Sequence, residues 1–114
     1  MSSWVRYHFN HLKRWREYAE AVARAARDLV PSARVYVVGS VARGRYTVLS
    51  DIDILIVVPH RVDPRTFARD VLVRAMDLYG LPIDAPVEIH VVEEGGERPY
   101  LEGGFIEVRL EERD

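Results

Sequence analysis

Residues 39–58 read GSVARGRYTVLSDIDILIVV, and this stretch carries more information than the rest of the chain. It opens with a turn bounded by Gly39 and Gly44, and it closes with Asp51 and Asp53 at the head of an apolar run. Because alternate residues of a strand share one face, we expect both carboxylates to project to the same side, close enough to bind a divalent metal. A phosphate-holding turn beside a metal-holding strand indicates chemistry on a nucleotide.

The turn itself offers groups that suit phosphate. Gly39 permits a tight bend at the end of a strand, and Ser40 presents a hydroxyl and a backbone amide to a phosphate oxygen. Arg43 and Arg45 follow, and their guanidinium groups match the geometry of phosphate oxygens. We therefore predict that these four residues bind the nucleotide. Such a turn is weak evidence alone, and the paired aspartates that follow it strengthen the prediction.

A third carboxylate is expected from a later strand. Residues 87–92, VEIHVV, are rich in β-branched side chains and carry Glu88 near their start. Together with Asp51 and Asp53, Glu88 would complete a site for two Mg²⁺ ions, with Mn²⁺ as an alternative, and would take the proton from an attacking hydroxyl. His90 shares a strand face with Glu88, and a packing role for this histidine is favoured over a place beside the site.

The flanking sequence predicts a small domain of the α+β (α/β) class, in which one mixed sheet is flanked by helices. Apolar spacing and chain breakers indicate helix 3–30, strand 34–38, a helical turn 40–44, strand 50–58, helix 63–80, strand 87–92, a short helix 97–101, and a fourth strand or docking segment over 105–110. Residues 1–114 would form a single domain, divided into an N-terminal helix 1–30, a catalytic core 34–92 and a tail 93–114.

Composition narrows the class of protein further. The 114 residues are 48% hydrophobic, which suits a packed core, and the net charge of -2 lacks the basic surplus typical of a nucleic-acid-binding domain. Cysteine is absent, which excludes disulfides and thiolate metal sites.

Neither a signal peptide nor an apolar run of membrane-spanning length is visible, so we expect a cytoplasmic protein without membrane association. Basic residues gather in the first helix and acidic residues in the tail, a pattern that fits either a polarised surface for a partner or ordinary solvated faces.

These motifs resemble those of the nucleotidyltransferase superfamily typified by DNA polymerase beta, whose signature is a Gly-Ser pair followed by Asp-x-Asp. Here the pair is Gly39-Ser40 and the second motif is Asp51-Ile52-Asp53. The fuller string over residues 39–53 is most similar to the minimal nucleotidyltransferases of bacteria and archaea. The resemblance covers residues 34–92 and implies the nucleotidyltransferase fold.

The resemblance also implies a role for each matching residue. The turn, with Gly39, Ser40 and Arg43, would hold the triphosphate of an NTP, and the Asp-x-Asp motif would bind Mg²⁺. The third carboxylate of the family is commonly aspartate, whereas this chain offers Glu88, whose side chain is longer by one methylene.

Minimal members of the superfamily are often paired with small helical HEPN proteins as toxin–antitoxin systems. The resemblance therefore implies an antitoxin that transfers AMP from ATP to a tyrosine of a HEPN toxin, as a protein adenylyltransferase. The length leaves no room for the DNA-gripping domains of a polymerase, so no DNA-binding domain is expected. Two alternatives stay open. One is a catalytically weak scaffold that neutralises a partner by binding, and the other is a nucleotidyltransferase for antibiotics or similar small molecules, with its pocket built between the subunits of a homo-oligomer.

Overall fold

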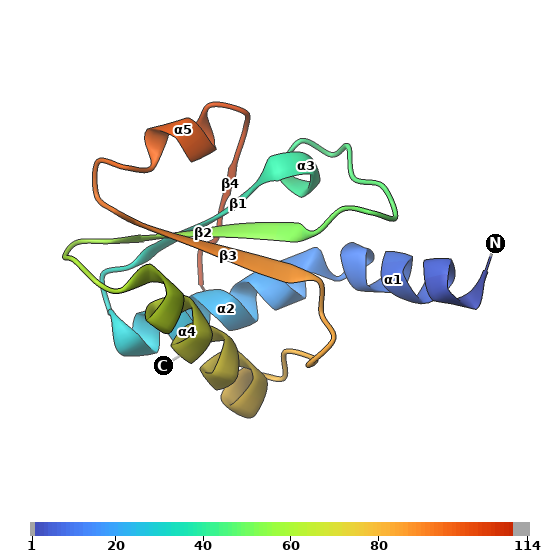
Figure 1. Cartoon of the computed structure of the whole chain (residues 1–114), viewed down its shortest axis with the longest axis horizontal. Helices are drawn as coiled ribbons and strands as arrows, with labels where there is room; N and C mark the ends of the chain where they lie inside the picture. The colour runs from blue at the N-terminus through green and yellow to red at the C-terminus, as the bar shows by residue number, and fades with distance from the viewer. Residues whose placement is uncertain (1, 111–114) are drawn as a thin grey trace.

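The computed structural model describes residues 2–110, and Figure 1 shows one sheet with helices on both sides. The helices are α1 (Ser3–Lys13), α2 (Trp15–Leu29), α3 (Gly39–Ala42), α4 (Pro64–Tyr79) and α5 (Arg98–Leu101). The strands are β1 (Arg34–Val38), β2 (Ile52–Val58), β3 (Val87–Glu93) and β4 (Ile106–Glu107). Residue 1 and residues 111–114, the end of the predicted tail 93–114, lie outside the described residues.

Within residues 2–110, four strands form one mixed sheet in the order β3-β2-β1-β4. Strand β1 runs antiparallel to both β2 and β4, whereas β2 and β3 are parallel. Helix α4 makes the crossover that a parallel pair needs. The predicted mixed sheet flanked by helices is thereby confirmed. The predicted fourth strand over 105–110 is shorter than expected, with two residues that pair with Tyr36 and Val37.

The two faces of the sheet differ because strand residues alternate. Ile52, Ile54 and Ile56 of β2 are fully buried in the core that β2 forms with α2 and α4 below the sheet in Figure 1. Alanine and valine make up most of the buried face of α2, which lets the helix approach the sheet closely. Burial of each isoleucine contributes about 1.5–3 kcal/mol. The alternate residues, beginning with Asp53 and Leu55, therefore project to the opposite face, on the side of α3 and α5.

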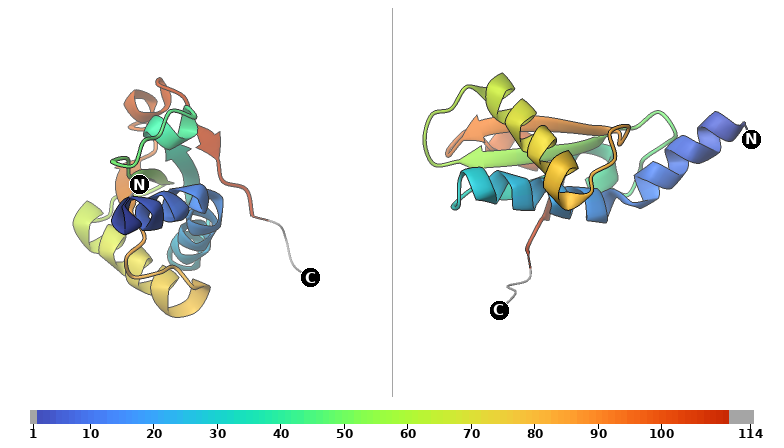
Figure 2. Two further views of the ribbon diagram at one scale, coloured as in Figure 1. Left: turned by 90° about the vertical axis from the view of Figure 1, so that its right-hand side faces the viewer. Right: turned by 90° about the horizontal axis from the view of Figure 1, so that it is seen from below.

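The predicted helix 3–30 is wrong as one continuous helix, because the structure divides it at Arg14 into α1 and α2. The Arg14 N–H donates to His11 O at 3.0 Å, and His11 Nδ1 lies 2.6 Å from the Tyr18 hydroxyl across the break. The break lets α2 follow the sheet while α1 projects past the ends of the strands, on the side where β2 and β3 begin (Figures 1 and 2). Neither glycine nor proline marks the break, so apolar spacing alone predicts one helix.

Helix α4 begins and ends where the local sequence predicts. The Asp63 carboxylate accepts a hydrogen bond of 3.1 Å from the Thr66 N–H, and Pro64 occupies the first helical position. Gly80 ends the helix in the left-handed region at φ 74°. Helix α4 has 16 residues, and no helix in the described part of the chain combines the length and the apolar character that crossing a bilayer requires.

Candidate metal and nucleotide site

Three side chains from two strands meet on the face of the sheet opposite α2 and α4. The parallel register of β2 and β3 places Asp53 beside Glu88, and Leu55 beside His90. Because alternate residues share a face, Asp53, Glu88 and His90 project to the same side. One ligand atom from each of these three residues, which we call the Asp53 cluster, lies within 4.8 Å of the others. The structure thus brings together two of the predicted metal ligands, Asp53 and Glu88, and adds His90 to them.

His90 is held against Asp53. Its Nε2 atom lies 3.1 Å from Asp53 Oδ1, within hydrogen-bonding distance, and each of the two side chains is 27% exposed. The Tyr100 ring of α5 lies 5.5 Å from the His90 ring. The structure therefore places His90 beside the candidate site, whereas the sequence favoured a packing role for this histidine. The sequence does carry one signal for this placement of His90, because the residue follows Glu88 by two positions and therefore shares its strand face.

The glycine turn lies directly against this cluster. Gly39 adopts φ 70°, and the pairing of Val38 with Asp53 across β1 and β2 brings the turn beside that carboxylate. A Cβ atom at position 39 would lie 2.5 Å from Asp53 Oδ2. Glycine is therefore required twice, for the backbone conformation and for the approach of the carboxylate. Because α3 begins at Gly39, the half-buried Ser40 and the first N–H groups of this helix lie at the same end of β2.

The two predicted phosphate-binding arginines differ in their surroundings. Arg43 caps the end of α3, and its side chain lies against the turn at Gly103 and Gly104, since a Cβ atom added to Gly103 would be 3.0 Å from Arg43 Nη1. Arg45 is exposed in the loop between α3 and β2, and its N–H donates to Ser40 O at 2.9 Å. Nucleotide binding by either arginine stays a prediction.

Asp51 lies outside the Asp53 cluster in the part of the chain that the structure describes. It is exposed, one residue before β2 begins at Ile52. The Ile52 N–H donates to Pro86 O at 2.7 Å, so ordered pairing starts immediately after Asp51. The strand pairing that fixes Asp53 therefore does not fix Asp51, whose role as a metal ligand stays a prediction.

The donor set of the Asp53 cluster fits a divalent cation. Asp53 and Glu88 are register partners on the parallel strands β2 and β3, and one oxygen of each lies within 4.8 Å of the other, a separation at which two carboxylate charges repel. Among residues 2–110, neither carboxylate forms an ion pair with arginine or lysine. Two carboxylates and an imidazole whose donor atoms converge are suitable ligands for a divalent metal. The turn at Gly39 leaves room for the Asp53 carboxylate to take part.

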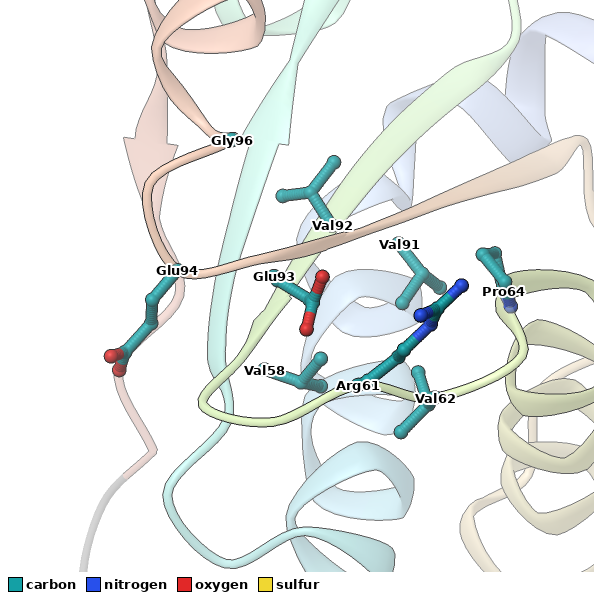
Figure 3. Close-up of a pocket in the computed structure, with 9 residues that line it drawn as sticks. All are labelled: Val58, Arg61, Val62, Pro64, Val91, Val92, Glu93, Glu94 and Gly96. Carbon is teal, nitrogen blue, oxygen red and sulfur yellow. The ribbon is translucent and has the colours of Figure 1, made fainter.

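A pocket of about 490 Å³ lies at the other ends of β2 and β3 (Figure 3) and does not include the Asp53 cluster. Its charged lining residues include Arg61 and Glu93, and Val58 forms part of its wall. Val58 follows Asp53 by five residues, which at about 3.3 Å per residue is roughly 16 Å along the strand. Concavity and metal-ligand chemistry therefore indicate different places, and the chemistry identifies the candidate site.

Comparison with known proteins agrees with this geometry. The model of a family described as "Nucleotidyltransferase domain" matches residues 19–113. The crystal structure of a protein from Sulfolobus solfataricus, described as a "putative nucleotidyltransferase", is similar to the chain with a TM-score of 0.61 and 22% sequence identity, covering 94% of this chain and 87% of that chain. At this identity the likeness concerns the fold. No protein of curated function matches the sequence.

Because the family match spans most of its length, the chain belongs to the nucleotidyltransferase domain family. The structural likeness shows the same fold, a mixed sheet flanked by helices. The resemblance that the Gly39-Ser40 and Asp51-Ile52-Asp53 motifs carry to nucleotidyltransferases is thereby confirmed. The family typically uses a divalent metal and an NTP, and the Asp53 cluster provides a candidate ligand set for the metal.

Proposed function

We propose that this chain is a metal-dependent nucleotidyltransferase that transfers AMP from ATP to a hydroxyl group. The observation that carries the proposal is the register of β1, β2 and β3, which brings Gly39, Asp53 and Glu88 together. Gly39 opens the turn expected to hold phosphate, and the two carboxylates, with oxygens within 4.8 Å of each other, favour a cation between them. A phosphate site beside a cation site is the arrangement that nucleotidyl transfer requires.

In the proposed reaction, the acceptor oxygen forms a bond to the α-phosphorus of ATP, and the bond between that phosphorus and the oxygen of pyrophosphate breaks. Glu88, which is exposed, accepts the proton that the acceptor hydroxyl loses. Asp53, Glu88 and the nearby Asp51 would hold Mg²⁺ or Mn²⁺. When bound, the divalent metal supplies neutralisation of the charge on the phosphate oxygens.

The remaining predicted site residues hold the triphosphate. The Ser40 hydroxyl and the N–H groups at the start of α3 donate to phosphate oxygens, as the position of the turn beside Asp53 suggests. Arg43 and Arg45 offset the charge of the departing pyrophosphate, because one guanidinium group can donate hydrogen bonds to two phosphate oxygens at once. The contact of Arg43 with the Gly103–Gly104 turn would keep its side chain ordered while it does so.

We further propose that the acceptor is a tyrosine of a small helical HEPN-type protein, and that the chain acts as the antitoxin of this partner. The sequence resemblance to minimal nucleotidyltransferases supports this acceptor. The exposure of Glu88 supports it as well, because a tyrosine hydroxyl carried by another protein can reach an exposed carboxylate.

Intact-mass spectrometry of the HEPN partner after incubation with ATP and Mg²⁺ or Mn²⁺ tests this function. We expect one or more AMP units to be added by the wild-type chain, and Asp53→Asn to slow the addition by about a hundredfold or more. Glu93→Gln is the matched control, since Glu93 lies at the far end of the strand that carries Glu88. An unmodified partner that is folded and bound to the wild-type chain would contradict the proposal.

A binding-only function is the second candidate. It is favoured by glutamate at position 88 in place of the usual aspartate, and by the position of Asp51 outside the Asp53 cluster. The double change Asp51→Ala with Asp53→Ala separates the two functions in a toxin-neutralisation assay. Neutralisation that persists in the double variant supports binding alone, whereas its loss with the complex still intact supports catalysis.

A further inference from the structure

We propose that His90 is a direct ligand of the metal at the Asp53 cluster, bound through Nε2, and that the cluster consequently prefers a divalent first-row transition ion such as Mn²⁺ over Mg²⁺. The inference rests on the proposed function, because it takes Asp53 and Glu88 as metal ligands. It adds a nitrogen donor to a site that the sequence motifs describe with oxygen donors alone.

The geometry places the imidazole nitrogen among the carboxylate oxygens. One donor atom each of Asp53, Glu88 and His90 lies within 4.8 Å of the other two. His90 Nε2 is 3.1 Å from Asp53 Oδ1, so this nitrogen is directed at the carboxylate. The backbones that carry the three side chains are fixed, since β2 and β3 pair over seven consecutive positions. The fold therefore arranges the three donors before any ion binds.

The His90 side chain is also restrained by its neighbours. Its ring lies 5.5 Å from the Tyr100 ring, with an angle of 44° between the two planes. Its register partner on β2 is the fully buried Leu55. Because the His90 side chain is only 27% exposed, it has little rotational freedom to lose when a ligand binds. This restraint favours His90 as a fixed donor over a mobile surface histidine.

A nitrogen ligand changes which metal a site prefers. Mg²⁺ favours oxygen ligands and gives up its water reluctantly, whereas imidazole is a good ligand for first-row transition ions. A neutral imidazole binds metal through one ring nitrogen while the other carries the proton. Since Nε2 is the nitrogen directed at Asp53, it is the atom placed for coordination.

A role limited to orienting Asp53 through a hydrogen bond is the competing explanation. The change His90→Gln separates the two roles. Glutamine keeps a hydrogen-bond donor for the Asp53 carboxylate but offers a metal only an amide oxygen. An orienting residue would therefore leave the choice between Mn²⁺ and Mg²⁺ unchanged in this variant, whereas a ligand would not.

Pulsed EPR of the Mn²⁺-loaded chain tests the nitrogen ligand directly. We expect the signal of a directly bound ¹⁴N nucleus in the wild type and in the control His60→Gln, whose histidine is exposed on the loop after β2. The signal should disappear in His90→Gln. Bound Mn²⁺ without nitrogen coupling in the wild type would overturn this inference and leave the proposed function intact.

Calorimetric titration with Mn²⁺ and with Mg²⁺ tests the preference. We expect His90→Gln to weaken Mn²⁺ binding about tenfold or more and Mg²⁺ binding less. Equal losses for the two ions, or no loss, would overturn the inference, provided that circular dichroism shows the variant folded. Wild-type protein that binds neither ion would overturn the metal site itself, and with it the proposed function.

Discussion

Three residues approach the Asp53 carboxylate, two of them from β3 and one from the turn that follows β1. Glu88 of β3 lies opposite it, His90 of the same strand lies within hydrogen-bonding distance, and Gly39 at the end of β1 lies so close that no side chain fits. We therefore predict that a substitution at any one of these three positions alters cation binding at this carboxylate. Gly39 is the position where this effect is easiest to separate from general stability.

Gly39→Ala is expected to lower the free energy of unfolding by about 1–3 kcal/mol, because alanine is strained in the left-handed region. It should also weaken metal binding, since the new Cβ would displace the Asp53 carboxylate. Gly80→Ala is the matched control: Gly80 has φ 74°, but an added Cβ would meet nothing within 4 Å. Denaturant unfolding and metal titration should show similar stability losses in the two variants and a metal-binding loss only in Gly39→Ala. Equal metal affinities would contradict the proposed contact.

The sequence could predict Asp53 and Glu88 as partners because each lies close to the start of a strand with a clear pattern. It could not settle the role of His90, because that role depends on the register between β2 and β3, two strands that α4 separates in the sequence. A slip of one residue in that register would move every side chain of β3 to the other face. The position of Asp51 was equally open, because strand pairing begins one residue after it.

At the level of elements, the loop that leads into β3 is attached at two points. The Tyr7 hydroxyl of α1 donates a hydrogen bond to Asp84 in this loop, and His11 Nε2 lies 3.5 Å from the same carboxylate. The Ile52 N–H of β2 donates to Pro86 O at 2.7 Å. Helix α1 thus supports the segment from which β3, and with it the Asp53 cluster, continues.

The hydrogen bond between Tyr7 and Asp84 gives this attachment a pH dependence. It lowers the pKa of Asp84 from its ordinary value of 3.8 and raises the pKa of Tyr7 from 10.0. The contribution of Asp84 to stability is therefore present above pH 3.8 and is lost as the pH falls through the lower folded-state pKa. The contribution of Tyr7 is present below pH 10.0 and is lost as the pH rises through its raised folded-state pKa.

Asp84→Asn is expected to increase amide hydrogen exchange in residues 3–13 several-fold near neutral pH, because the charged acceptor for Tyr7 is removed. The difference from wild type should disappear in strong acid, where the Asp84 carboxyl of the wild type is protonated in the folded and in the unfolded chain. Hydrogen-exchange mass spectrometry measures it, with Asp77→Asn, an exposed change on α4, as the control. Identical exchange in Asp84→Asn and wild type near neutral pH would show that α1 is not held through this carboxylate.

Elements with local signals were predictable, and elements that depend on distant contacts were not. Helix α4 has a capping aspartate, a proline at its first position and a glycine after its end, so both of its ends follow from sequence. The break at Arg14 has no such marker, and it separates α2, which packs under the sheet, from α1, which extends past it. In the described part of the chain, strand β4 consists of Ile106 and Glu107, and the contact with β1 ends with a hydrogen bond of 2.8 Å from the Val108 N–H to Val35 O.

The whole molecule separates a structural face of the sheet from a candidate reaction face (Figure 2). Helices α2 and α4 cover one face of the sheet, and α3 and α5 lie on the other. The Asp53 cluster belongs to this second face, where Gly39 of α3 lies against Asp53 and Tyr100 of α5 lies beside His90. The family match covers residues 19–113, so α1 lies outside it while the sheet and the turn at Gly39 lie within it. The part of the chain that matches the family therefore contains every residue of the candidate site, and α1, outside the match, contacts the loop that leads into β3.

The decisive measurement is the position of Mn²⁺ and a non-hydrolysable ATP analogue in crystals of this chain, located by the anomalous scattering of the ion. We predict an ion bound by Asp53 and Glu88, with the triphosphate against the Gly39-Ser40 turn. An ion or nucleotide bound instead in the pocket lined by Arg61 and Glu93, or no ion at Asp53 at saturating concentrations, would contradict the proposed site.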